Sequence, residues 1–209
     1  MKALICHSGG MDSSICLKLA MEEYGPGEVL SVGFDYGQRH KSEEEAASLI
    51  ARAFGVERTI IPIPIFSLLG NNALVDHSLP IQNLNTLVAG RNGLMAWHAA
   101  LLAHKLGAHE VHLGVMELEE ANSGYRDCSR AYMDLLEKIL QIDLNDRAFR
   151  LCTPLVQMTK KESHDLAAQL GILPFLLEHT VSCYEGLKGR GCEKCPACLL
   201  RNKALDEDA

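Results

Sequence analysis

The chain has 209 residues, with 20 Lys and Arg against 27 Asp and Glu, and therefore a formal net charge of −7 at pH 7. Hydrophobic residues make up 47% of it and charged residues 22%, which is typical of a globular protein and too apolar for a disordered one. The acidic balance disfavours nucleic acid or an anionic membrane as a dedicated partner, and no apolar run approaches the roughly 20 residues of a membrane-spanning helix. With no apolar leader at the N-terminus, the sequence predicts a cytoplasmic protein.

Apolar runs and helical patterns alternate along the first two thirds of the chain. Periodicity predicts strands at 2–6, 28–37, 57–66 and 110–115, and helices at 13–23, 41–55, 91–108 and 128–143. Such alternation favours an α/β fold, in which a parallel sheet with helices on both faces binds ligands beyond the carboxyl ends of its strands.

Two segments fall outside this alternation. The polar stretch 70–90 is long for a loop within a compact domain, and we interpret it as a cover over the site. After Pro174 the periodicity weakens and a tail rich in Gly and Cys begins. We therefore predict a main domain at 1–173 and a small C-terminal segment at 174–209.

The first predicted strand is joined to the first helix by SGGMDSS, residues 8–14. A glycine-rich turn at the start of a helix directs backbone N–H groups and the positive end of the helix dipole at one point, which favours an anion. No Lys follows the glycines, so this is not the loop of nucleotide hydrolases. The loop suits pyrophosphate and a magnesium ion, although a simple strand-to-helix turn with a serine cap remains an alternative. The residues expected to bind phosphate are Ser8, Gly9, Gly10, Asp12, Ser13 and Ser14.

Four of the eight cysteines fall within the last 30 residues, at metal-ligand spacing. Four thiolates satisfy a tetrahedral zinc ion and leave no open coordination position, so the zinc would be structural and would fix a tail that has few large apolar side chains. An iron–sulfur cluster is the chemical rival. The predicted ligands are Cys183, Cys192, Cys195 and Cys198.

Three further segments place polar side chains where loops follow strands: FDYGQRH at 34–40, GRN at 90–92 and SGYRDC at 123–128. Each alone could be a surface or capping motif. SGGMDSS resembles the pyrophosphatase loop of the N-type ATP pyrophosphatases, also called PP-loop enzymes. Together with TPL at 153–155 and SCYEG followed by CEKCPACLLR, the motifs resemble the 7-cyano-7-deazaguanine synthase family over nearly the whole chain.

This resemblance implies a Rossmann-like PP-loop domain of the adenine nucleotide alpha hydrolase type, with a zinc-binding tail. It implies that ATP with Mg²⁺ adenylates 7-carboxy-7-deazaguanine, that ammonia gives an amide, and that a second activation gives the nitrile used for queuosine. By resemblance, the residues acting on phosphate or the acyl adenylate are Asp12, Arg39, Arg91 and Lys160, and those binding the substrate are Tyr36, Gln38, Arg91, Asn92, Ser123, Tyr125 and Asp127.

The segment after the fourth predicted strand departs from the family pattern, since Glu117 is followed by LEEAN in place of a short acidic and aromatic step. A relative that activates the same acid, transfers it to another amine such as one on a protein, and stops at the amide is therefore a second hypothesis. A zinc-ribbon module that binds nucleic acid and a tRNA-thiolating enzyme are further alternatives. The sequence leaves open a homodimer.

Overall fold

The structure, a computed structural model of the chain, describes residues 1–39, 41–64, 72–76, 78–81, 85–118 and 124–206. Five parallel strands form one sheet in the order β3-β2-β1-β4-β5. The strands are β1 (Ala3–Cys6), β2 (Val29–Asp35), β3 (Glu57–Pro62), β4 (Glu110–Leu113) and β5 (Arg150–Cys152). The α-helices of the described residues are α1 (Met11–Tyr24), α2 (Ser42–Ala53), α3 (Arg91–Leu106), α4 (Arg130–Asp143), α5 (Lys160–Gln169), α6 (Leu173–His179) and α7 (Pro196–Asp206).

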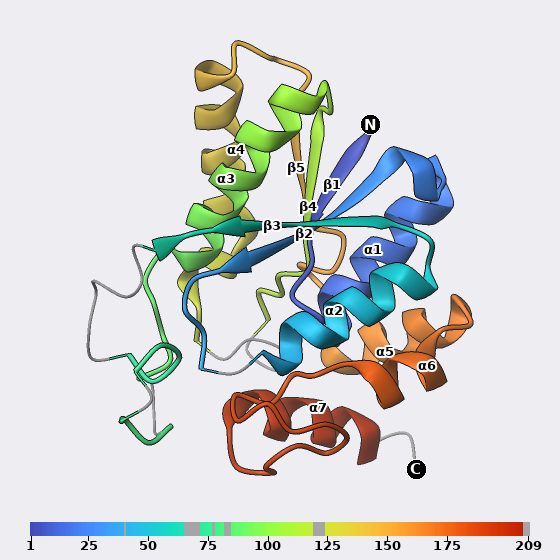
Figure 1. Cartoon of the computed structure of the whole chain (residues 1–209), viewed down its shortest axis with the longest axis vertical. Helices are drawn as coiled ribbons and strands as arrows, with labels where there is room; N and C mark the ends of the chain where they lie inside the picture. Colours follow the sequence, from blue (N-terminus) through green and yellow to red (C-terminus); the bar gives the residue numbers. More distant parts are fainter. Residues whose placement is uncertain (40, 65–71, 77, 82–84, 119–123, 207–209) are drawn as a thin grey trace.

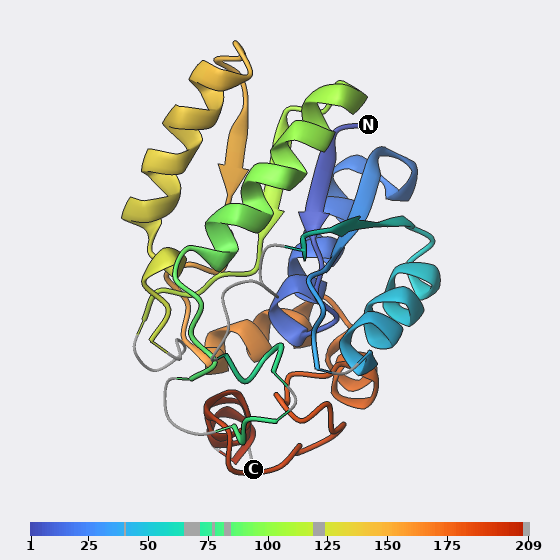
Figure 2. The ribbon, with the colours of Figure 1, turned by 60° about the vertical axis from the view of Figure 1, so that its left-hand side comes forward.

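Helices cover both faces of the sheet (Figures 1 and 2). Side chains of β1 alternate between two cores: Leu4 packs with α3 and α4, while Ala3 and Ile5 pack with α1, α2, α5 and α6. Because β1 and β2 are buried on both faces, their sequences are nearly continuous apolar runs, as in parallel sheets generally, whereas the edge strand β3 is partly exposed and carries Glu57 and Arg58. The predicted α/β fold with a parallel sheet is confirmed.

The strand order reverses direction at β1, whose neighbours are β2 on one side and β4 on the other. The chain crosses from β3 to β4 through the segment that contains α3, so the loops after β1 and β4 diverge to opposite faces. A crevice at such a switch point is where open parallel sheets bind ligands. Here a Cβ atom on Gly114 would lie only 2.7 Å from Ser13 N, so the end of β4 approaches the start of α1 closely.

Four strands and helices of the structure were not predicted from periodicity: β5, α5, α6 and α7. β5 has only three residues, which is too short for a periodic pattern. The buried residues of α5 are Ser163, His164 and Ala167, so its inner face carries no large apolar stripe. A capping box that joins Thr159 and Glu162 marks its start, and this T-x-x-E pattern was a signal available in the sequence.

The C-terminal segment lies beyond the carboxyl ends of the strands, where α7 packs against α5 (Figure 1). Leu176 of α6 is fully buried in the core formed with α1 and α2, so packing of the main domain continues past Leu173. The division into 1–173 and 174–209 stays a prediction.

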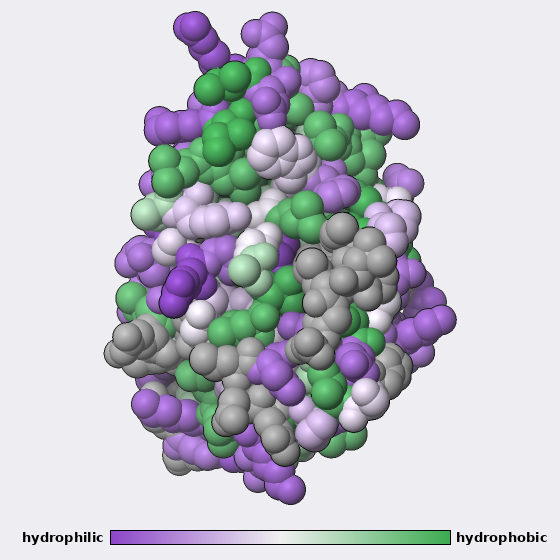
Figure 3. Space-filling model, turned by 90° about the vertical axis from the view of Figure 1, so that its left-hand side faces the viewer, coloured by the Kyte–Doolittle hydropathy of each residue, from purple (hydrophilic) through white to green (hydrophobic). Residues whose placement is uncertain are grey.

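The outer face of α3 and α4 carries apolar side chains, which gather over the upper part of Figure 3. On α4, Leu135, Ile139 and Ile142 are 66%, 47% and 79% exposed. The homodimer that the sequence leaves open is not tested by this surface. Among the described residues, no helix combines the length and apolar character needed to cross a membrane.

Candidate active site

A cavity of about 290 Å³ opens at the carboxyl ends of the strands, between the loops that follow β1 and β4. It is walled by residues of both loops, by the ends of β2 and α3, by α2 and α5, and by the C-terminal segment. Of the predicted site residues, the structure brings together Ser8, Gly10, Asp12, Tyr36, Gln38, Arg91, Asn92, Tyr125 and Lys160 around this cavity.

The loop between β1 and α1 turns tightly at Gly9, which has φ +85°. A Cβ atom at this position would collide with the carbonyl oxygen of Glu43, because the start of α2 packs directly on the loop. Gly10 is the N-cap of α1 and, having no side chain, makes no cap hydrogen bond to the first N–H groups of the helix. The amino end of α1 therefore faces the cavity with its dipole available to an anion.

Two loop serines hold the loop instead of lining the cavity. The hydroxyl of Ser14 is fully buried, donates to Gly10 O at 2.7 Å and lies 3.1 Å from His7 Nε2. Ser13 Oγ donates to Gly10 O at 3.1 Å and accepts from Ser8 N at 3.2 Å. Ser13 and Ser14 therefore support the loop, while Ser8 lines the cavity, and the predicted contact of Ser13 and Ser14 with phosphate stays a prediction.

His7 lies next to the loop and is 1% exposed. Its Nδ1 atom lies 2.9 Å from Ser31 Oγ. Burial, together with the charge of Arg58, lowers the pKa of His7 to about 3. The ring is therefore neutral at physiological pH and connects the loop to β2 without adding charge.

Basic side chains of α5 and α7 reach the end of the cavity that the loop between β1 and α1 forms. Lys160, the first residue of α5, has its Nζ atom 2.5 Å from Asp12 Oδ2. Arg201 of α7 is 6% exposed and donates from Nη2 to Leu177 O at 3.3 Å, while its buried Nε atom has no hydrogen-bond partner among the described residues. Burial lowers the pKa of Arg201, and the negative charges of Cys198 and Asp12 oppose that shift.

Arg201 was not predicted as a site residue. Its sequence signal is its position at the end of CPACLLR, three residues after the last zinc-ligating candidate Cys198. Because α7 begins at Pro196 within that motif, the helix carries Arg201 from the cysteine cluster to the cavity.

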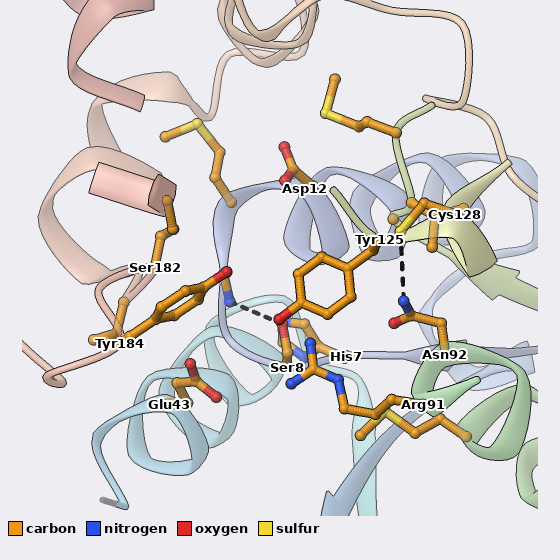
Figure 4. Close-up of a pocket in the computed structure, with 18 of the residues that line it drawn as sticks. His7, Ser8, Asp12, Glu43, Arg91, Asn92, Tyr125, Cys128, Ser182 and Tyr184 are labelled. Carbon is orange, nitrogen blue, oxygen red and sulfur yellow. Dashed lines mark hydrogen bonds between the residues drawn. The ribbon is translucent and has the colours of Figure 1, made fainter. Parts of the chain in front are cut away.

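The opposite end of the cavity is built around Arg91, the first residue of α3. Its guanidinium lies over the ring of Tyr125, 5.0 Å from the centroid, and Tyr125 in turn donates from its hydroxyl to Thr86 O at 3.0 Å. In Figure 4, Arg91, Tyr125, Tyr184 and Glu43 surround one space. The guanidinium of Arg91, the tyrosine rings and the carboxylate of Glu43 are thus available to a planar, polar ligand.

Asp127 does not line this space. It is 4% exposed and its Oδ2 atom accepts a 2.7 Å hydrogen bond from the backbone N–H of Asn92, so the carboxylate caps the amino end of α3. The Asn92 side chain donates from Nδ2 to Cys128 Sγ at 3.4 Å (Figure 4). In this structure Asp127 holds the start of α3 through Asn92, and its predicted recognition of the base stays a prediction.

Glu43 is the carboxylate that the sequence reasoning missed. Three acidic side chains line the cavity among the described residues, and two of them pair with a base: Asp12 with Lys160 and Glu44 with Arg58. Glu43 stands next to Arg91 instead, without a hydrogen bond to it. Burial raises the pKa of Glu43 to about 7, although the positive charge of Arg91 acts in the opposite direction.

Arg39 does not line the cavity in this structure, and its predicted action on phosphate stays a prediction. Its Nη1 atom donates to Leu79 O at 2.9 Å and to Ala73 O at 3.4 Å, and its backbone N–H donates to Leu74 O at 2.9 Å. Arg39 thus fastens the segment after β3 to the start of α2, and Leu74 of that segment lines the cavity. The cover predicted at 70–90 stays a prediction, since it lies partly outside the described residues. Ser123 also lies outside them.

The four predicted zinc ligands lie together, with all four Sγ atoms within 4.8 Å of one another. Cys195 N donates to Cys192 Sγ at 3.3 Å and Glu185 N to Cys183 Sγ at 3.4 Å, which are contacts that stabilise thiolates. Burial raises the pKa of Cys192, but hydrogen bonds from backbone N–H groups outweigh it and lower the pKa to about 7. A Cβ atom on Gly191 would collide with Cys198 Sγ. The cluster therefore fits a closed structural zinc site.

This cluster is coupled to the active site through the backbone. Val181 N donates to Gly9 O at 3.1 Å, and Ser182 lines the cavity directly before Cys183. The C-terminal segment therefore touches the phosphate loop at one end and supplies Arg201 at the other.

Comparison with known proteins agrees with this geometry. The family model described as "Queuosine biosynthesis protein QueC" matches residues 2–209. Among solved structures, NMN synthetase from Francisella tularensis is similar in fold, with 17% sequence identity and a TM-score of 0.52 over 99% of this chain and 77% of that one.

Proposed function

Because this chain belongs to the QueC family of queuosine biosynthesis proteins, which use ATP-dependent PP-loop chemistry, we propose that it converts 7-carboxy-7-deazaguanine and ammonia to 7-cyano-7-deazaguanine. The observation that carries the proposal is the cavity with two chemically different ends. One end combines the amino end of α1 with Lys160 and Arg201, and the other combines Arg91, Glu43 and aromatic faces.

The reaction needs activation because a carboxylate does not react with ammonia. A carboxylate oxygen of the substrate attacks the α-phosphorus of ATP, the bond to the β-phosphate oxygen breaks, and pyrophosphate leaves with its charge. The amino end of α1, Lys160 and Arg201 stabilise that charge where it develops. Binding of the phosphates draws Lys160 from Asp12, whose carboxylate then faces the phosphates and would hold the magnesium ion that ATP brings.

In the acyl adenylate, Arg91 stabilises the negative phosphate beside the reacting carbon. Ammonia adds to that carbon and AMP leaves to give the amide. The amide oxygen then attacks a second ATP, pyrophosphate leaves again, and loss of AMP with two amide protons forms the nitrile. Ammonia must be neutral to add to the carbon, and the activated amide must lose its N–H protons as the nitrile forms. Glu43 accepts the proton that ammonium or the amide gives up.

The planar base binds beside Arg91, with Tyr125 and Tyr36 supplying aromatic faces and Asn92 supplying a polar edge. Asp127 contributes by fixing Asn92 through its backbone N–H. The zinc ion would be held by the four cysteines and would keep α7, and therefore Arg201, in place.

The test is product analysis. The zinc-loaded protein is incubated with ATP, Mg²⁺, ammonium and 7-carboxy-7-deazaguanine, and AMP and product masses are followed. We expect the nitrile and two AMP per product molecule. Amide as the final product would support transfer to another acceptor, and no AMP would contradict both.

A matched pair of variants isolates the role of the loop. Asp12→Asn removes the carboxylate at the phosphate end and should abolish AMP release, while the midpoint of thermal unfolding confirms that the protein is folded. Glu22→Gln makes the same chemical change on the same helix, in an ion pair with Lys18, and should leave AMP release unchanged.

A further inference from the structure

A second cluster of metal-ligating side chains lies outside the active site, on adjacent strands of the sheet. Glu110 and His112 alternate on β4 and so point to the same face, and Cys152 of β5 is the register partner of His112. The ligand atoms of the three side chains lie within 4.8 Å of one another. None of the three lines the active-site cavity.

From this juxtaposition we propose that Glu110, His112 and Cys152 form a second site for a divalent transition-metal cation such as Zn²⁺. Two ligands at alternate positions of one strand and a third on the neighbouring strand converge on a point above the sheet. Tetrahedral zinc with bonds of about 2.0–2.3 Å places its ligand atoms about 3.3–3.8 Å apart, so the side chains need to close in by at most about 1.5 Å to complete the site.

The donor set fits a zinc-like ion more closely than Mg²⁺ or Ca²⁺. Imidazole nitrogen and thiolate sulfur are ligands of borderline metals, whereas the two hard cations prefer oxygen alone. The carboxylate is also oriented from outside, because Tyr24 donates from its hydroxyl to Glu110 Oε2 at 3.0 Å. Hydrogen bonds of this kind hold metal-bound carboxylates in place.

The environment of His112 independently indicates a bound metal ion. It is 6% exposed, its Nε2 atom lies 3.0 Å from Glu110 Oε2, and its buried Nδ1 atom has no hydrogen-bond partner within the described ranges. A buried polar nitrogen without a partner is costly in a purely structural position. The ring has nearly the same shape after half a turn about Cβ–Cγ, so either nitrogen can face the cluster as a ligand.

The site is accessible. A groove of about 600 Å³ runs past the cluster, and it is lined by Tyr24, Glu110, His112, Cys152, Arg130 and Glu137 among others. Three protein ligands leave a coordination position open toward this groove. The second metal is therefore bound in an open site, in contrast to the closed four-cysteine cluster.

Metal stoichiometry tests the proposal with Zn²⁺ as the probe. After dialysis against buffered Zn²⁺ and removal of free metal, elemental analysis should find two zinc ions per chain. His112→Val and Cys152→Ala should each reduce this to one, whereas Cys6→Ala, which removes a thiol of β1 outside the cluster, should keep two.

Co²⁺ provides a second readout that does not depend on the fold of one variant. Protein loaded with Co²⁺ should show thiolate-to-cobalt charge-transfer absorption from both sites. Cys152→Ala should remove only the absorption that appears with the second equivalent of Co²⁺. One zinc ion per chain in the unaltered protein, or a second ion retained by both His112→Val and Cys152→Ala, would overturn the proposal and leave the cluster as a hydrogen-bonded group.

Discussion

Glu43 gives the sharpest prediction, because its carboxylate should both assist the reaction and destabilise the fold. The pKa is about 7 in the folded protein against an ordinary value of 4.5, and burial is the main cause. The folded state therefore binds a proton that the unfolded state has already released between these two pH values. A difference of about 2.5 in pKa corresponds to about 3 kcal/mol at 1.36 kcal/mol for each pKa unit.

Ionisation of Glu43 lowers the stability of the folded protein as the pH rises. The ionised Glu43 costs free energy only in the folded state, so this cost is absent below pH 4.5, grows as the pH rises, and is complete above pH 7. At pH 5, just above the unfolded pKa, Glu43→Gln should therefore be more stable than the unaltered protein by less than about 1 kcal/mol. At pH 8 it should be more stable by up to about 3 kcal/mol.

The assay is urea unfolding of both proteins at pH 5, 6, 7 and 8, together with the rate of AMP formation. Glu45→Gln, an exposed carboxylate in the same turn of α2, is the control and should show neither effect. The unaltered enzyme should lose activity as the pH falls through 7, and Glu43→Gln should be slow at every pH. A stability difference that does not change with pH would refute the reasoning, as would a fully active variant.

Three further predictions follow from the same contacts. Gly9→Ala should cost about 3 kcal/mol of stability or more, because the backbone conformation and the carbonyl of α2 both oppose a Cβ atom, whereas Gly107→Ala, which has a similar φ but open space, should cost about 1 kcal/mol in urea unfolding. Arg201→Met should weaken pyrophosphate binding about ten- to a hundredfold by calorimetry, with Arg190→Met, an exposed ion-pair variant in the same segment, as the unaffected control. Cys198→Ser should release the zinc ion of the tail and expose residues 181–206 to limited proteolysis; a protected tail in protein without that zinc would contradict the structural role.

The sequence was informative where chemistry follows from residue type at fixed spacing. The four cysteines and the loop at Gly9 and Gly10 could be recognised because metal ligation and tight turns restrict which residues are possible. The strands at 2–6 and 28–37 were recovered with shifted ends, since a buried parallel strand is a nearly continuous apolar run, and 57–66 was recovered although β3 is a partly exposed edge strand. β5 was missed because three residues carry no period.

Carboxylate roles could not be predicted in the same way. Asp127 and Glu43 both lie near the start of a helix or turn, and only the packing of the helices decides that Asp127 caps α3 while Glu43 faces the cavity. In SEEEAA the three glutamates are equivalent by composition, but the phase of α2 turns Glu43 and Glu44 inward and leaves Glu45 exposed. Residue type supplied the candidates, and tertiary structure selected among them.

The cavity should transfer the adenylyl group of ATP to an oxygen of the substrate. The most direct measurement uses 7-carboxy-7-deazaguanine labelled with ¹⁸O in both carboxylate oxygens, with mass spectrometry of AMP and product. Two successive adenylations should leave one ¹⁸O in each of the two AMP molecules and none in the nitrile. Unlabelled AMP would contradict the account, because the phosphate would then never have been joined to the substrate.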